Sequence, residues 1–226
     1  MSGKRKIPLK NNQYYYVFNR SIAKFVIFND ASEFERMFQL LNLYRFSNFN
    51  YKYSDYNDLD LSTQNAVVDE LKSNYNVLVE IIAYCLMPTH IHLILRQILD
   101  KGITKYIGRV LNGYSKYFNA KHKRSGPLWT SRFKSVLISG DVQLLHLSRY
   151  IHLNPTSAGL AARPEDWKFS SYGEYVNRLD DNLGICRFDD IMEKNSKEYK
   201  KFVEDRKSYQ RELSIIKSFL IDNYSG

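Results

Sequence analysis

The stretch YCLMPTHIHLIL, residues Tyr84–Leu95, predicts two strands joined by a sharp turn. Proline lacks the amide hydrogen that a β-ladder needs, so we expect the turn at Met87–Thr89. Residues two apart in a strand point to the same face of the sheet. His90 and His92 should therefore project together, with Ile91 and its alternate neighbours on the opposite face. Two adjacent imidazoles can form half of a divalent-metal site, and a pair of hydrogen-bonded surface histidines is the alternative.

A second segment, Tyr150–Pro155 with the sequence YIHLNP, adds chemistry to this pair. In a helix, Tyr150 and Asn154 are four residues apart and share a face. Pro155 disfavours helical geometry at Asn154, so we expect the helix to end there. A tyrosine hydroxyl can act as a nucleophile, and an amide oxygen suits a hard cation. A packed aromatic is the alternative for Tyr150, because the chain contains 18 tyrosines.

Composition indicates one globular domain, with or without an appendage. The chain has 226 residues, of which 44% are hydrophobic, which is enough to bury a core. Its two cysteines, Cys85 and Cys186, lie in no paired metal-binding motif. We find no signal peptide and no long apolar run, so the expected location is the cytoplasm.

The positive charge is concentrated in one part of the chain. Residues 101–140 contain nine Lys or Arg and no Asp or Glu, and this surplus equals the net charge of +9. Both signs normally intermix on a merely solvated face. A basic block in an otherwise balanced chain therefore indicates a polyanionic partner.

Hydrophobic periodicity predicts an α+β domain with helices on one face of an antiparallel sheet. Residues 47–62 predict a polar loop, Ser32 and Glu35 fit a capping box for the first helix, and Asp141 is the expected cap of the tyrosine helix. One or two further helices are expected within residues 188–224. The predicted strands cover residues 13–28 (with an interruption near residues 19–21), residues 77–86, residues 90–96 and residues 129–138. The predicted helices cover residues 32–44, 63–74, 102–120 and 141–154.

Five motifs in this chain resemble those of the HUH single-tyrosine transposases, and their order and spacing resemble the REP-associated branch. The motifs are Met87–Leu93, Gly126–Trp129, Arg132–Ser135, Tyr150–Pro155 and Trp167–Tyr172. The resemblance implies a ferredoxin-like version of the predicted sheet. It suggests a transposase domain over residues 1–175 and a helical C-terminal extension over residues 176–226, packed on the same domain.

The resemblance also implies a function and assigns roles to residues. The implied function is that of a metal-dependent single-strand DNA endonuclease and strand transferase, acting through a covalent 5′-phosphotyrosine on hairpin-containing repeat DNA. Tyr150 would be the nucleophile, and His90, His92 and Asn154 the metal ligands. The insertion-sequence branch usually has Gln where this chain has Asn154. Mg²⁺ or Mn²⁺ fits because a phosphate oxygen is a hard ligand, and zinc is the alternative with two imidazoles.

The expected partner is single-stranded DNA that forms hairpins, with no membrane involved; a monomer and a homodimer are both left open. Trp129 either stacks on an unpaired base or packs in the core. His146, one turn before Tyr150, could assist proton removal or be structural, whereas His152 should be structural and His122 a surface residue. The residues favoured for DNA binding are Arg109, Lys116, Lys123, Arg124, Trp129, Arg132 and Lys134.

The sequence leaves three other functions to consider. A domesticated nucleic-acid-binding module that no longer cleaves is the main alternative. An RNA-recognition module would share the ferredoxin-like sheet, but its aromatic consensus strand is missing from the sequence. A metallohydrolase that uses a metal-bound water would need a general base, and the segment around His90 offers no Glu or Asp for that role.

Overall fold

A four-stranded antiparallel sheet forms the centre of the molecule. The structure is a computed structural model that describes residues 8–177, 184–188 and 195–205. The strands are β1 (Tyr14–Arg20), β2 (Val79–Met87), β3 (His90–Gln97) and β4 (Lys134–Ile138), in the spatial order β2-β3-β1-β4. Helix α1 (Ala31–Tyr44) follows β1, and α4 (Gly102–Lys121) follows β3. The chain order β1-α1-β2-β3-α4-β4 is ferredoxin-like, which confirms the predicted fold class.

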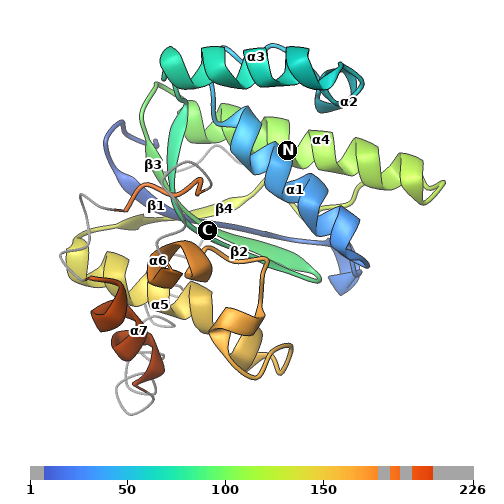
Figure 1. Ribbon diagram of the computed structural model, residues 1–226. Coiled ribbons are helices and arrows are strands. Elements are labelled where there is room, and N and C mark those ends of the chain that lie inside the picture. The colour runs from blue at the N-terminus through green and yellow to red at the C-terminus, as the bar shows by residue number, and fades with distance from the viewer. Residues whose placement is uncertain (1–7, 178–183, 189–194, 206–226) are drawn as a thin grey trace.

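Helices cover both faces of the sheet, so the prediction of helices on one face was wrong (Figure 1). Helices α1 and α4 lie on one face, with α2 (Tyr53–Asn57) and α3 (Leu61–Ser73) outside them. Helices α5 (Asp141–Ser157), α6 (Tyr172–Asn177) and α7 (Ser196–Glu204) lie on the other. The physical reason is that alternate strand residues, including Tyr16, Ile94 and Val136, form a second apolar surface that must also be covered.

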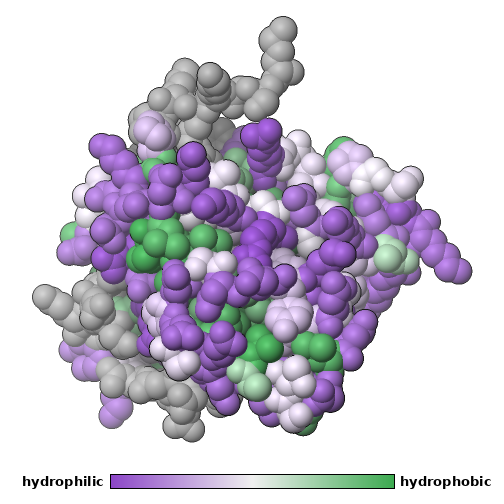
Figure 2. All heavy atoms as spheres, turned by 90° about the horizontal axis from the view of Figure 1, so that it is seen from above, coloured by the Kyte–Doolittle hydropathy of each residue, from purple (hydrophilic) through white to green (hydrophobic). Residues whose placement is uncertain are grey.

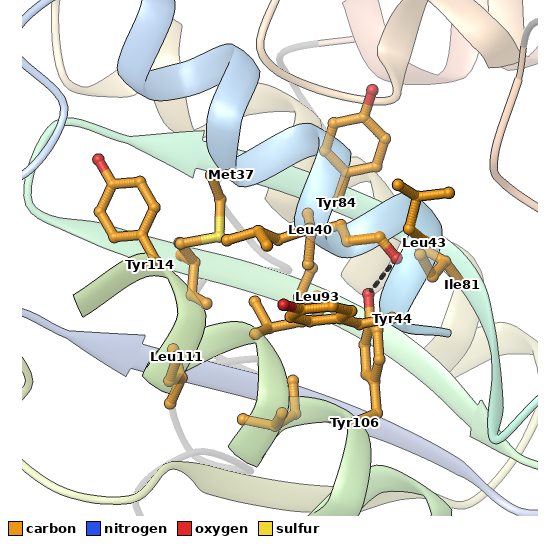
Figure 3. Packing of buried hydrophobic residues seen from close by; sticks show 14 of the residues in the cluster. Met37, Leu40, Leu43, Tyr44, Ile81, Tyr84, Leu93, Tyr106, Leu111 and Tyr114 are labelled. Atoms are coloured by element: carbon orange, nitrogen blue, oxygen red, sulfur yellow. Dashed lines mark hydrogen bonds between the residues drawn. The ribbon is translucent and has the colours of Figure 1, made fainter. Parts of the chain in front are cut away.

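The first face, between the sheet and the helices α1 and α4, is an apolar core. Leu93 of β3, Met37 and Leu40 of α1 and Leu111 of α4 pack together there (Figure 3). The hydroxyl of the buried Tyr106 donates to the carbonyl of Leu41 at 3.0 Å, so even this polar atom is satisfied. The outer surface of the α1, α3 and α4 layer is mainly hydrophilic, with small hydrophobic patches (Figure 2).

A bulge in β2 changes which residues face which core. The pairing of β2 with β3 shifts register between Ile81 and Ala83. Before the shift, Ile81 faces the α1 and α4 core, and after it Tyr84 does, so the odd–even alternation is reversed. Cys85 consequently packs in the second core, beside α5. One inserted residue in a strand has this effect because side chains alternate with a period of two.

Several element ends differ from the predicted ones. The α1 cap is Asp30, whose side chain accepts from the Glu33 amide, because this carboxylate precedes the first helical turn. Asp141 is the first residue of α5 rather than its cap, which is Gly140. The loop at 47–62 contains α2, and β4 begins at residue 134 rather than 129.

The tyrosine helix, α5, does not end at Asn154. It continues through Pro155 to Ser157, where the Ala158 amide donates to the Asn154 carbonyl at 3.0 Å. Proline removes one amide donor, but the burial of Pro155 and the bonds of the following turn hold the helix together. Of the predicted C-terminal helices, α7 is present, and residues 206–226 lie outside the described part of the chain.

Candidate active site

The two histidines of β3 lie side by side on the α5 face of the sheet. Their ring centroids are 4.8 Å apart and the rings are nearly perpendicular, at 89°. Ile91, Leu93 and Leu95 lie in the core on the opposite face, as the strand alternation predicted. The turn between β2 and β3 positions the pair, because His90 is the first residue of β3 and follows Thr89 directly. The hydroxyl of Thr89 hydrogen-bonds Nδ1 of His90 at 3.0 Å.

Tyr16 of β1 holds the ring of His92. Its hydroxyl hydrogen-bonds Nδ1 of His92 at 2.6 Å, and the two rings stack with centroids 5.8 Å apart. Nε2 of His92 is buried and has no hydrogen-bond partner among the described residues. A hydrogen bond donated by Nδ1 to the Tyr16 hydroxyl leaves a lone pair on Nε2, which is the form that binds a metal. A buried, unpartnered imidazole nitrogen therefore fits a divalent cation.

Helix α5 brings Tyr150 to the histidine pair. The Tyr150 ring is half-buried, and its centroid lies 6.0 Å from that of His92 and 6.5 Å from that of Tyr16. Residues distant in sequence thus meet at one point of the sheet. Helix α5 covers this face because Leu147 and Ile151, on the buried side of the same helix, pack in the second core.

Asn154 lies one turn after Tyr150 and is also half-buried. Its side-chain nitrogen donates to the Tyr150 carbonyl at 2.9 Å, so its oxygen is the atom that could coordinate a cation. The described residues include no group of three or more His, Cys, Asp or Glu side chains that could hold a metal ion. A third protein ligand beside His90 and His92 would accordingly be a neutral donor such as this amide.

The electrostatics of the pair favour neutral imidazoles. Burial, and to a smaller extent the Arg20 guanidinium, lowers the pKa of His90 to about 4. Burial, with His90 and Arg20 as smaller causes, holds the pKa of His92 well below its usual value. Both rings are consequently neutral near pH 7, the protonation state that a metal ligand requires.

A buried polar network fixes the other side of α5. Both ring nitrogens of His152 form hydrogen bonds: Nδ1 with the Tyr199 hydroxyl at 2.7 Å and Nε2 with the Ser171 hydroxyl at 2.8 Å. Tyr199 also hydrogen-bonds Ser148 at 3.0 Å. This network ties α5 to α7 and to the start of α6, in keeping with the structural role predicted for His152. The ring of His146 lies 5.6 Å from that of Phe202, so this histidine contacts α7.

The residues predicted to bind DNA do not all lie in similar surroundings. Arg109 donates to the carbonyls of Phe46 and Phe49, so its guanidinium holds a loop. The indole nitrogen of Trp129 donates to the Leu111 carbonyl at 3.3 Å, and the ring is partly buried against the apolar core. Arg124 is half-buried. The side chains of the others are exposed: Lys116, Lys123, Arg132 and Lys134.

Sequence reasoning missed Tyr16 and assigned His122 only to the surface. Tyr16 lies in a run of three tyrosines, Tyr14 to Tyr16, and nothing in that run distinguishes the one that contacts His92. His122 is partly exposed, but its Nε2 lies 2.5 Å from a carboxylate oxygen of the fully buried Glu33. Both contacts join segments far apart in the chain, which periodicity cannot detect.

The α+β fold places a histidine pair opposite a helical tyrosine, and comparisons with known proteins indicate which family this arrangement resembles. The family model described as "Transposase IS200 like" matches residues 47–154. This span contains His90, His92, Tyr150 and Asn154. The resemblance to the single-tyrosine transposases is thereby confirmed.

Two individual proteins that are similar to this chain carry the name REP-associated tyrosine transposase. A relative from Haemophilus influenzae that carries the name REP-associated tyrosine transposase is 28% identical over 105 residues. That alignment covers 41% of this chain and 58% of the relative. A solved structure of a REP-associated tyrosine transposase bound to a REP hairpin matches with a TM-score of 0.50 and 16% identity, covering 87% of this chain and 93% of that chain. At this identity the structural match shows the shared fold.

None of the helices that the structure describes is both long and apolar enough to span a bilayer.

Proposed function

We propose that this protein is a metal-dependent single-strand DNA endonuclease and strand transferase that forms a covalent 5′-phosphotyrosine at Tyr150. The observation that carries the proposal is the approach of Tyr150 to the histidine pair, with 6.0 Å between the ring centroids of Tyr150 and His92. A nucleophile and two neutral imidazoles on facing elements are the parts that such a reaction needs.

The reaction that these residues would perform exchanges one phosphate ester bond for another. The Tyr150 oxygen attacks the phosphorus of a phosphodiester, and the bond from phosphorus to the 3′ oxygen breaks. The proton of the Tyr150 hydroxyl ends on that oxygen, leaving a free 3′ hydroxyl. Because the new phosphotyrosine is again a diester, a 3′ hydroxyl of another strand can attack it and release Tyr150. Cleavage and strand joining are thus one reaction in two directions.

His90, His92 and the Asn154 oxygen are the groups that would hold Mg²⁺ or Mn²⁺. When bound, such a cation supplies Lewis-acid polarisation of the phosphate and offsets its developing negative charge. The chain itself would do the positioning: Tyr16 holds the ring of His92, and α5 holds Tyr150 over the pair.

The proposed DNA partner is a hairpin-forming single strand. The related structure contains a REP hairpin, and the basic block of residues 101–140 supplies exposed cations, among them Lys123 and Lys134. Phosphate binding by such cations releases counterions, so affinity should fall steeply with salt.

A covalent-adduct assay tests the proposal. The protein is incubated with single-stranded hairpin DNA and Mn²⁺, and a protein–DNA adduct is sought on a denaturing gel. The wild type should form it, and Tyr150→Phe, which keeps the ring and its packing, should form none while still binding DNA. Tyr117→Phe, on α4 at the other face of the sheet, is the matched control and should form the adduct normally.

One observation favours the alternative of a module that binds DNA without cleaving it. The described residues offer no acidic third ligand beside the histidine pair, so a cation would have only two imidazoles and a neutral amide oxygen as protein ligands. DNA binding by the wild type without any adduct would favour this alternative. An adduct that persists in Tyr150→Phe, or maps to another tyrosine by mass spectrometry, would contradict the assignment of the nucleophile.

A further inference from the structure

An exposed apolar loop, residues 21–26, lies at the end of β1. Ile22, Phe25 and Val26 are 39%, 48% and 43% exposed. Among the large hydrophobic side chains that the structure describes as exposed, no other three lie so close together in the sequence. Exposing three such residues within one short loop needs a reason beyond the ordinary scatter of surface apolar groups.

This 21–26 loop is held in place beside the candidate active site. The Ser21 amide donates to the Thr89 carbonyl at 2.9 Å, and the Ile27 amide donates to the Pro88 carbonyl at 2.8 Å. Pro88 and Thr89 form the turn that precedes His90, and Arg20, the residue before the loop, pairs with His90 across the sheet. Both ends of the loop are therefore fixed to the turn that carries the histidine pair. Figure 1 shows the loop and this turn at the same end of the sheet.

The backbone of the loop adopts an unfavourable conformation at its tip. Ala23 and Lys24, two consecutive residues with side chains, have φ values of 50° and 57°. The left-handed region is costly for a residue with a Cβ atom, and glycine would relieve the cost. Such conformations persist where the surrounding structure enforces them and are common at functional sites.

The charges around the loop are mainly positive. Residues 13–29 and 101–140 contain no Asp or Glu, and the nearest carboxylates, Asp30 and Glu33, are already paired with Lys121 and His122. The Arg124 guanidinium lies 5.5 Å from the centroid of the Phe25 ring. Lys24 and Lys123, which precede Phe25 and Arg124 in the sequence, are both exposed. The Phe25 ring also meets Phe118 edge to face at 5.9 Å, which fixes its orientation. An aromatic ring held among cations matches the stacking platforms that bind single-stranded nucleic acid.

We propose that the 21–26 loop binds an unpaired segment of DNA that passes from the active site over the end of the sheet, with a base stacked on Phe25 and adjacent phosphates neutralised by Lys24 and Arg124. The proposal rests on the proposed function, and it adds a base-binding subsite and a basis for preferring single strands. In a duplex both faces of each base are covered by neighbours, so Phe25 could not stack. A partner without negative charge would leave Lys24 and Arg124 without a counter-charge.

Binding to a short labelled oligothymidine and to a duplex of equal length, measured by fluorescence anisotropy at one salt concentration, tests this subsite. Phe25→Ala should weaken single-strand binding about 10-fold, because base–aromatic stacking contributes on this order per base, and should leave duplex binding nearly unchanged. Phe25→Trp keeps a stacking surface and should retain single-strand affinity. Leu137→Ala is the matched control: Leu137 is 46% exposed and pairs with Tyr15, away from the turn.

Each other outcome has a definite meaning once thermal melts show that the variants are folded. Equal single-strand affinity in Phe25→Ala and wild type would overturn the subsite and leave the proposed function standing. An equal loss on single strand and duplex would also overturn it, since stacking would not be the cause. Concentration-dependent dimers that Phe25→Ala abolishes would show that the loop binds a second copy. A wild type that binds no single-stranded DNA at all would overturn the proposed function together with the subsite.

Discussion

The two faces of the sheet differ in what their buried side chains do. Strand β3 supplies both: Leu93 and its alternate neighbours enter the apolar core under α1 and α4, while His90 and His92 face α5. The apolar face is filled by aliphatic and aromatic packing. The α5 face carries histidines, serines and tyrosine hydroxyls in short hydrogen bonds, among them the bond of Tyr16 to His92.

This difference separates stability from chemistry within one small domain. Apolar packing contributes stability in proportion to the buried area and asks for no particular geometry of polar atoms. Buried polar groups contribute little net stability and become costly when they lose a partner. The α5 face, with fewer apolar side chains in its core, can therefore hold Tyr150 and the histidines in position while the opposite face contributes much of the stability. Substitutions on each face should separate these two roles.

The largest loss of stability should come from the apolar face. Leu93→Ala, at a fully buried site, should lower the free energy of unfolding by about 2–5 kcal/mol, from lost burial and the cavity left behind. Urea unfolding measures the loss. Mn²⁺ affinity of the folded fraction should stay close to that of the wild type, and a large selective loss of Mn²⁺ binding would show that the faces are not separable.

A smaller loss is expected from the network behind α5. Tyr199→Phe removes the hydroxyl that joins Ser148 and His152 and leaves both groups buried without it. The free energy of unfolding should fall by about 1–3 kcal/mol, the usual cost of unsatisfied buried polar groups. The control is Tyr51→Phe, at a 40% exposed tyrosine, which should change stability little in the same urea titration. Equal effects of the two substitutions would mean that the network does not stabilise the packing of α7 on α5.

Tyr16→Phe should change stability least of the three substitutions, and it should clearly weaken Mn²⁺ binding. The ring that stacks on His92 is kept, and only the hydroxyl that orients Nδ1 is lost. Stability should fall by about 1 kcal/mol. Mn²⁺ affinity should fall about 10- to 100-fold, as for other groups that orient a metal ligand. Calorimetric titration measures the affinity, with His90→Ala as the baseline for a lost ligand.

Tyr14→Phe controls for the loss of a hydroxyl from the same strand, at a position that pairs with Arg96 rather than beside His92. Nitrogen NMR of the metal-free protein gives a second readout, since the orienting role requires the His92 proton on Nδ1. A proton found on Nε2 in the wild type, or unchanged Mn²⁺ affinity in Tyr16→Phe, would remove Tyr16 from this role.

Much of the site could be predicted from the sequence because its parts are local. His90 and His92 share a face through the two-residue alternation of a strand, and the four-residue spacing of Tyr150 and Asn154 places them one helical turn apart. The strand and helix order followed from hydrophobic periodicity for the same reason. Each of these inferences needs only neighbours within one element.

The tertiary structure decided what depends on contacts between distant segments. The sequence pattern did not show that α5 covers the second face, that a bulge reverses the alternation of β2, or that α5 continues through Pro155. It also could not select Tyr16, 76 residues from His92, among 18 tyrosines. Periodicity reports which side of an element is apolar but not which element will cover it. That choice follows from packing the whole chain around one sheet, and it brings Tyr150 to the histidines.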